Sequence, residues 1–87
     1  MTSGVVVEIE GVMAPAEFRN LGDAVAALWE SLRVLPLGWT QFEAYRYFFD
    51  TAGAEERVRT FLERDRCLVL SFAMAGRSHA VRVEIPR

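Results

Sequence analysis

The sequence predicts an α+β fold, in which helices pack on one face of a small, single-layer, mostly antiparallel sheet. Three observations carry this prediction: apolar residues alternate near both ends of the chain, they recur at helical spacing between those ends, and glycine or proline punctuates the boundaries. With 87 residues, 52% apolar and 25% charged, the composition is that of one globular domain spanning residues 1–87. The expected element order is β-α-(α or β)-α-β-β.

The first strand is expected over residues 4–12, where the side chains of the two faces differ in character. One face would carry Val5, Val7 and Ile9, and the other would carry Val6, Glu8 and Glu10. This alternation predicts a strand that is buried on one face.

A connection containing Pro15 is expected over residues 13–19, followed by the first helix. Asn20 is a good N-cap for that helix, because its side chain can accept a hydrogen bond from the first turn. The helix should end near Val34, since the residues before Pro36 are pushed out of the α region.

Residues 41–49 fit two structures. The segment Thr40 to Glu43 has the spacing of a capping box, which favours a short helix with Phe42 and Tyr45 on one side. The same stretch is rich in aromatic residues that are typical of strands. The sequence leaves both structures open.

The remaining chain predicts a helix over residues 54–64 and strands over 67–72 and 79–85. The turn signal at 75–78 makes these two strands a hairpin. Because residues 67–72 are apolar on both faces, we expect a central position in the sheet.

Residues able to carry catalysis are scarce. Cys67 and His79 are the only cysteine and histidine, and no residue is evident that would orient them as a pair, so we expect a packed cysteine and a surface histidine. No glycine pattern forms a phosphate loop, and one cysteine cannot build a disulfide or a cysteine zinc site. The prediction is therefore no catalytic residue, no metal and no cofactor, in a reducing cytoplasm.

The charged residues are expected to form solvated surfaces. The open sheet face would carry Glu8, Glu10, Arg82 and Glu84. The third helix and its end carry Arg57, Arg59, Arg64 and Arg66, interleaved with Glu55, Glu56, Glu63 and Asp65. Such interleaving predicts a helix surface that neutralises itself rather than a phosphate-binding stripe.

Net charge and basic composition restrict the partners and the source. A net charge of −2 argues against nucleic acid as a partner, and no apolar run is long enough for a membrane span. All ten basic residues are arginine, which is typical of GC-rich coding sequence and indicates a high-GC bacterium or its phage. A core this small also makes a homodimer a reasonable expectation.

The aromatic density from Trp39 to Phe49, six residues in eleven, is the feature that composition does not explain. One helix or strand cannot bury all six against one sheet, so one or two should reach the surface, Tyr47 first. Exposed aromatic residues and arginine are concentrated in protein interfaces. The predicted partner-binding residues are therefore Trp39, Arg46 and Tyr47.

These observations predict a small, non-enzymatic protein-interaction module, such as a regulator, an inhibitor or an immunity-type accessory protein. The alternative is a dimeric domain that binds a small ligand or acts as a cofactor-free enzyme. Its apolar pocket would lie near Phe42, Phe48 and Phe72.

Overall fold

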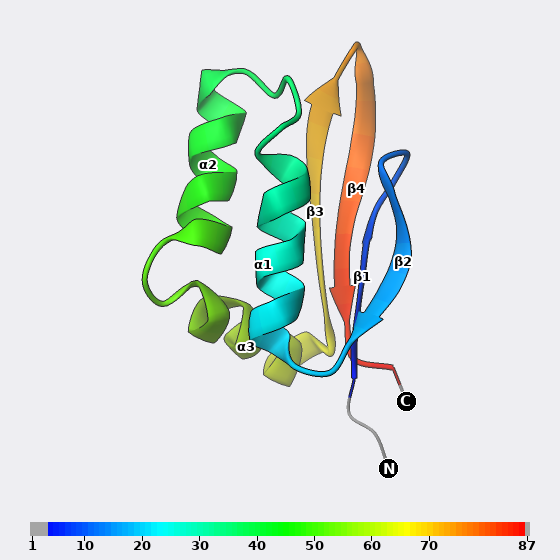
Figure 1. The fold of residues 1–87 in the computed structure, drawn as a ribbon, viewed down its shortest axis with the longest axis vertical. Helices are drawn as coiled ribbons and strands as arrows, with labels where there is room; N and C mark the ends of the chain where they lie inside the picture. Colours follow the sequence, from blue (N-terminus) through cyan, green and yellow to red (C-terminus); the bar gives the residue numbers. More distant parts are fainter. Residues whose placement is uncertain (1–3, 87) are drawn as a thin grey trace.

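The computed structural model describes residues 4–86 and shows a four-stranded antiparallel sheet with three helices packed against it. The elements follow in the order β1 (Val5–Ile9), β2 (Met13–Phe18), α1 (Leu21–Leu32), α2 (Trp39–Asp50), α3 (Ala54–Asp65), β3 (Cys67–Met74) and β4 (Arg77–Glu84). The sheet order is β2-β1-β4-β3, so β1 and β4 are central. The predicted α+β class, with helices on one face, is confirmed (Figure 1).

The prediction of a connection over residues 13–19 was wrong, because this segment contains the edge strand β2. Val7 pairs with Ala16 and Ile9 with Met13, so two residues of β2 oppose Glu8 in a bulge that includes Pro15. An edge strand tolerates proline at such a position, since no ladder hydrogen bond needs its missing N–H.

The central position predicted for residues 67–72 was also wrong, because β3 is the other edge of the sheet. Leu68 and Phe72 are buried, but Val69 on the opposite face is 53% exposed. Apolar residues on both faces of β3 therefore do not mean that the strand has a neighbouring strand on each side.

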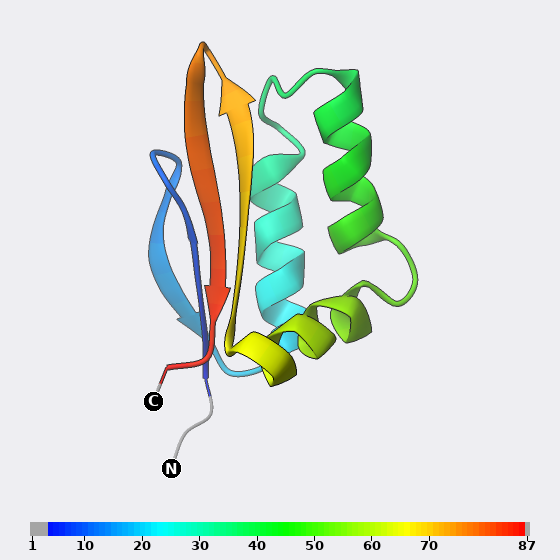
Figure 2. The same cartoon turned by 180° about the vertical axis from the view of Figure 1, so that it is seen from behind.

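The first helix follows the prediction closely. The Asn20 side chain accepts a hydrogen bond of 2.8 Å from the Asp23 backbone N–H, and the helix ends at Leu32. Its buried stripe includes Leu28 and Leu32, which are fully buried. It packs on β1 and β2 and also contacts both α2 and α3, so it lies between the sheet and α2 (Figure 2).

Residues 41–49 are helical, which settles the alternative that the sequence left open. The helix begins two residues earlier than the predicted capping box, with Gly38 as N-cap at φ 82° and no side-chain cap. Thr40 therefore lies inside the first turn. The φ of Gly38 lies in the left-handed region, which glycine adopts without a side-chain clash.

The hairpin of β3 and β4 is confirmed, with Met74 paired to Arg77 beside a two-residue turn. The first and last strands are neighbours, as expected for charge pairing across them, and Glu8 lies opposite Arg82. Among the helices of residues 4–86, none is long and apolar enough to cross a membrane.

Candidate protein-binding surface

The structure keeps the two candidate nucleophile and base residues apart. Cys67 pairs with Glu84 at one end of the β3–β4 hairpin, whereas His79 pairs with Phe72 five ladder positions away, or about 17 Å along the strand. Cys67 is exposed, so the expectation of a packed cysteine was wrong. The His79 ring stacks on buried Phe72 with centroids 5.2 Å apart. His79 Nδ1 lies 2.9 Å from the Glu10 carbonyl oxygen, which ties β4 to the β1–β2 turn.

The three carboxylates expected on the open sheet face do not converge. Glu8 forms an ion pair with Arg82 at 3.6 Å. The Glu10 carboxylate instead accepts a hydrogen bond from the Ala80 backbone N–H at 3.1 Å, so it extends the ladder beyond β1. Among residues 4–86, no group of three or more His, Cys, Asp or Glu side chains is placed to hold a metal ion.

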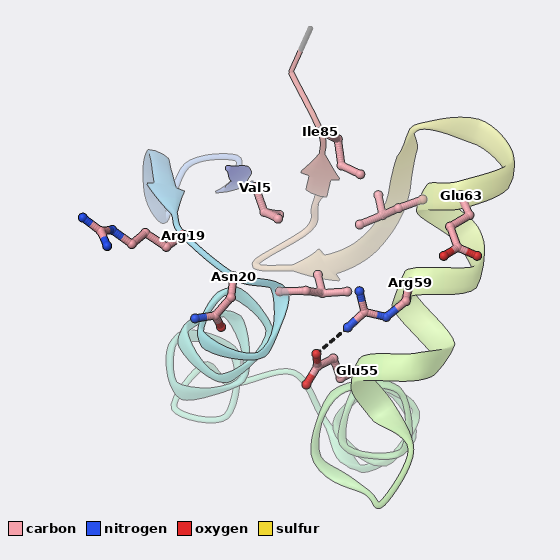
Figure 3. Close-up of a pocket in the computed structure, with 9 residues that line it drawn as sticks. Val5, Arg19, Asn20, Glu55, Arg59, Glu63 and Ile85 are labelled. Atoms are coloured by element: carbon pink, nitrogen blue, oxygen red, sulfur yellow. Dashed lines mark hydrogen bonds and ion pairs between the residues drawn. The ribbon is translucent and has the colours of Figure 1, made fainter. Parts of the chain in front are cut away.

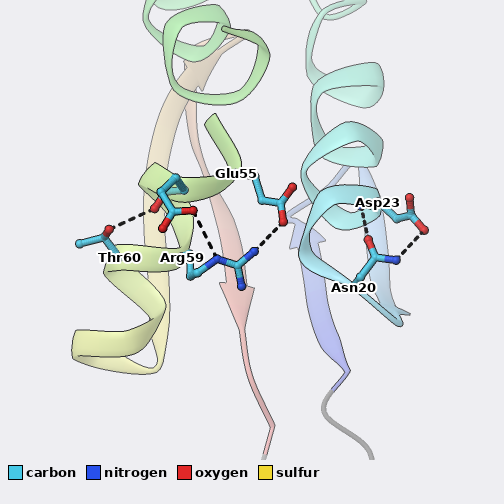
Figure 4. Close-up of polar contacts among 6 residues, drawn as sticks. Asn20, Asp23, Glu55, Arg59 and Thr60 are labelled. Atoms are coloured by element: carbon cyan, nitrogen blue, oxygen red, sulfur yellow. Dashed lines mark hydrogen bonds and ion pairs between the residues drawn. The ribbon is translucent and has the colours of Figure 1, made fainter. Parts of the chain in front are cut away.

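The arginines of α3 are mostly engaged with nearby carboxylates. Arg59 pairs with Glu55 one helical turn away and with Glu56 at 3.7 Å, and Arg64 pairs with Asp65 at 3.2 Å. Figure 4 shows Arg59 held between two carboxylates while Asn20 and Asp23 cap α1 nearby. Arg59 and Arg64 are thus neutralised, as the sequence predicted, whereas Arg57 and Arg66 form no ion pair within residues 4–86.

The cavity near these residues is about 360 Å³ and has an apolar floor with a charged rim. Val5, Leu62 and Ile85 are among its apolar lining residues, and Arg59 points across the opening toward Glu55 (Figure 3). The Arg59 guanidinium is therefore already neutralised by carboxylates and is not a free cation in this cavity.

The predicted partner-binding residues share the outer face of α2. Trp39 is 76% exposed and Tyr47 is 58% exposed, and Arg46 is also exposed and pairs with Glu43 at 3.1 Å. At 100° per residue, all of them lie within a third of the helix circumference. The opposite side of α2 buries Tyr45 and Phe49. The expectation that two of the six aromatic residues reach the surface is confirmed.

Tyr47 is held in place by α3. The Arg57 guanidinium carbon lies 4.3 Å from the centroid of the Tyr47 ring, and the Arg57 Nη2 donates to the Tyr47 carbonyl oxygen at 2.8 Å. The Thr51 hydroxyl donates to the same carbonyl at 2.6 Å. The cation–π contact positions the Tyr47 ring before any partner arrives, which lowers the entropy cost of binding, and the two hydrogen bonds fix its backbone carbonyl.

The apolar pocket predicted near three phenylalanines does not form as one cavity. Phe42 packs against Trp29 at 5.4 Å and Phe72 against Tyr45 at 6.1 Å, both in the core. Phe48 alone lines a hollow of about 300 Å³ between α2 and β3.

Sequence reasoning missed how α2 covers the edge of β3. The Gln41 side-chain amide donates to the Ala73 carbonyl at 2.9 Å and accepts from the Ala73 N–H at 2.8 Å, as a neighbouring strand would. The Tyr45 hydroxyl donates to the Ser71 carbonyl at 2.8 Å, and burial raises the pKa of this hydroxyl. The i, i+4 spacing of Gln41 and Tyr45 was a signal that two polar groups emerge from one side of the helix.

Comparisons with protein-family models, with curated proteins and with solved structures find no significant match to this chain. The class that fold and surface define is therefore a two-layer α+β domain with an exposed aromatic helix face, and its function must be argued from that face.

Proposed function

We propose that this protein is a small, non-enzymatic protein-binding module whose partner docks on the outer face of α2, at Trp39, Arg46 and Tyr47. The observation that carries the proposal is the joint exposure of Trp39 (76%) and Tyr47 (58%) on one face of one helix. Tryptophan, tyrosine and arginine are the residue types that contribute most to interface energies.

The outer face of α2 offers aromatic side chains that a partner can bury, and one of them, Tyr47, is already held by a contact with α3. A tryptophan or tyrosine side chain can bury roughly 150–250 Å² and still keep its polar atom at the rim of an interface. Arg57 holds the Tyr47 ring, and Trp39 lies at the beginning of the helix, next to the cap at Gly38. A partner would therefore meet a tyrosine that is already positioned.

A regulator, an inhibitor or an immunity-type accessory protein would each act through such a face, in the cytoplasm of a high-GC bacterium or its phage as the sequence predicts. A homodimer stays a prediction, which sedimentation of the purified chain tests.

The test is a photo-crosslinking pull-down from native lysate. A photoreactive phenylalanine analogue replaces Tyr47 in one protein and Val12, an exposed residue of the β1–β2 turn, in the control. We expect a stoichiometric partner crosslinked from position 47 and not from position 12. Double substitution of Arg46 and Tyr47 by alanine should weaken binding by at least ~10-fold.

Two outcomes would contradict the proposal: recovery of no stoichiometric partner, or unchanged affinity of the double variant. The thermal stability of the double variant is measured alongside, because both side chains are exposed and their loss should leave the fold intact.

A further inference from the structure

The sheet ends in an edge that the protein covers along only half of its length. Gln41 and Tyr45 bond to the outward peptide groups of Ala73 and Ser71, as described above. In an antiparallel ladder, alternate residues point both peptide groups away from the paired strand. By this alternation, Val69 and Cys67 also direct their N–H and C=O groups outward from β4.

This second half of the edge is open. Among residues 4–86, no group bonds to the outward N–H or C=O of Val69 or Cys67. The Val69 side chain is 53% exposed beside them. Unpaired peptide groups at alternate residues are complementary to one kind of ligand, an extended polypeptide that adds as a further strand.

The hollow between α2 and β3 lies where such a strand would need space. It measures about 300 Å³ and is lined by Ala44, Tyr45, Phe48, Leu70 and Ser71. An added strand beside β3 would pass this hollow, because α2 and β3 line it together. Its side chains on the helical face would enter the hollow, whose lining is mainly apolar.

The charge at one end of the open edge specifies the ligand further. Arg66 directly precedes β3, is exposed, and forms no ion pair with any residue of the range 4–86. The neighbouring arginines Arg64 and Arg82 are already paired, with Asp65 and Glu8. An acidic side chain in the ligand would therefore complement Arg66.

We propose that the segment Cys67–Val69 binds an extended segment of a partner protein as a short fifth strand, with an apolar residue in the α2 hollow and an acidic residue beside Arg66. Pairing of β3 with the β3 of a second copy is the competing occupant, and a dimer in sedimentation that Val69→Pro abolishes would overturn the proposal. The site is separate from the outer face of α2, so it does not depend on the function proposed above.

The test uses a phage-displayed library of short random peptides selected against the purified protein. We expect enriched peptides with alternating apolar residues and an acidic residue near one end. Their affinity should fall at least ~10-fold for Val69→Pro, which removes the outward N–H without removing a bond to β4. The matched control Val69→Ala keeps the N–H and should bind like wild type within ~3-fold.

Two further variants separate the parts of the site. Ala44→Trp fills the hollow and should abolish selection for the apolar residue. Arg66→Asn removes the positive charge and should abolish selection for the acidic residue. Asparagine is chosen because it tolerates the φ of 67° at this position. Backbone NMR shifts on adding the selected peptide should centre on residues 67–71.

The proposal is overturned if no peptide is enriched, or if the selected peptides bind Val69→Pro as tightly as Val69→Ala. Shifts centred on the outer face of α2 would also overturn it and would support the other surface instead. Circular dichroism of Val69→Pro verifies that the variant remains folded; if it does not, Ala44→Trp and Arg66→Asn decide the result.

Discussion

Replacing Gln41 by methionine should destabilise the protein by about 1.5–3 kcal/mol. Methionine has a similar length but makes none of the three hydrogen bonds of this amide, to the Leu37 carbonyl (2.7 Å), the Ala73 carbonyl (2.9 Å) and the Ala73 N–H (2.8 Å). Each such bond contributes about 0.5–1.5 kcal/mol, and partial exposure at Ala73 favours the lower half of that range because water can replace the lost partner.

The assay is urea unfolding of the wild type and of Gln41→Met, with amide hydrogen exchange at Ala73 as a local probe. The control is Glu43→Met on the same helix, which removes only the exposed ion pair with Arg46 and should cost about 0.2–0.5 kcal/mol. Faster exchange at Ala73 should accompany the loss of stability. A change below about 0.5 kcal/mol, with Ala73 still protected, would refute the idea that Gln41 substitutes for a neighbouring strand.

Three further predictions test other features. Tyr45→Phe should lower the free energy of unfolding by about 1 kcal/mol at pH 7. Burial raises the pKa of Tyr45 in the folded state above the unfolded value of about 10, so the stabilisation from its protonated hydroxyl is complete below that value and is lost as the pH rises through the folded pKa. The difference in unfolding free energy between Tyr45→Phe and wild type should therefore narrow in alkaline urea titrations. A constant difference would contradict the role given to this hydroxyl. Asn20→Ala should cost about 1 kcal/mol in urea unfolding, and helix fraying at Asp23 should be visible by NMR. Ala75→Asn should raise the melting temperature, because Ala75 has φ 54° in the turn and asparagine adopts the left-handed region at a cost lower by about 0.5–1 kcal/mol. An unchanged or lower melting temperature would argue against backbone strain at Ala75.

Local signals in the sequence were sufficient for most helices and strands. The Asn20 cap and Pro36 bracket α1, and the alternation near residue 81 defines β4, because these signals depend on neighbours in the chain. Tyr47 was identified as exposed because helical geometry alone places it opposite Phe42 and Tyr45.

The errors arose where contacts between distant segments decide the structure. β2 was missed because a bulge on an edge strand accommodates Pro15, and the sequence does not reveal which strand forms an edge. β3 was assigned to the centre because both of its faces are apolar, yet Cys67 and Val69 on one face are exposed. The cover on its edge comes from Gln41 and Tyr45, thirty-two and twenty-six residues earlier in the chain, which local signals in the sequence do not reveal.

The two edges of the sheet differ in a way that sets how many molecules can assemble. On β2, the bulge at Pro15 interrupts the regular ladder, and such irregular edges resist pairing with another chain. On β3, Gln41 and Tyr45 of α2 bond to the outward peptide groups of Ala73 and Ser71, which closes that half of the edge. Repeated strand addition is therefore opposed on β2 and along half of β3. A complex formed at β3 should contain one ligand per molecule and should not extend into filaments.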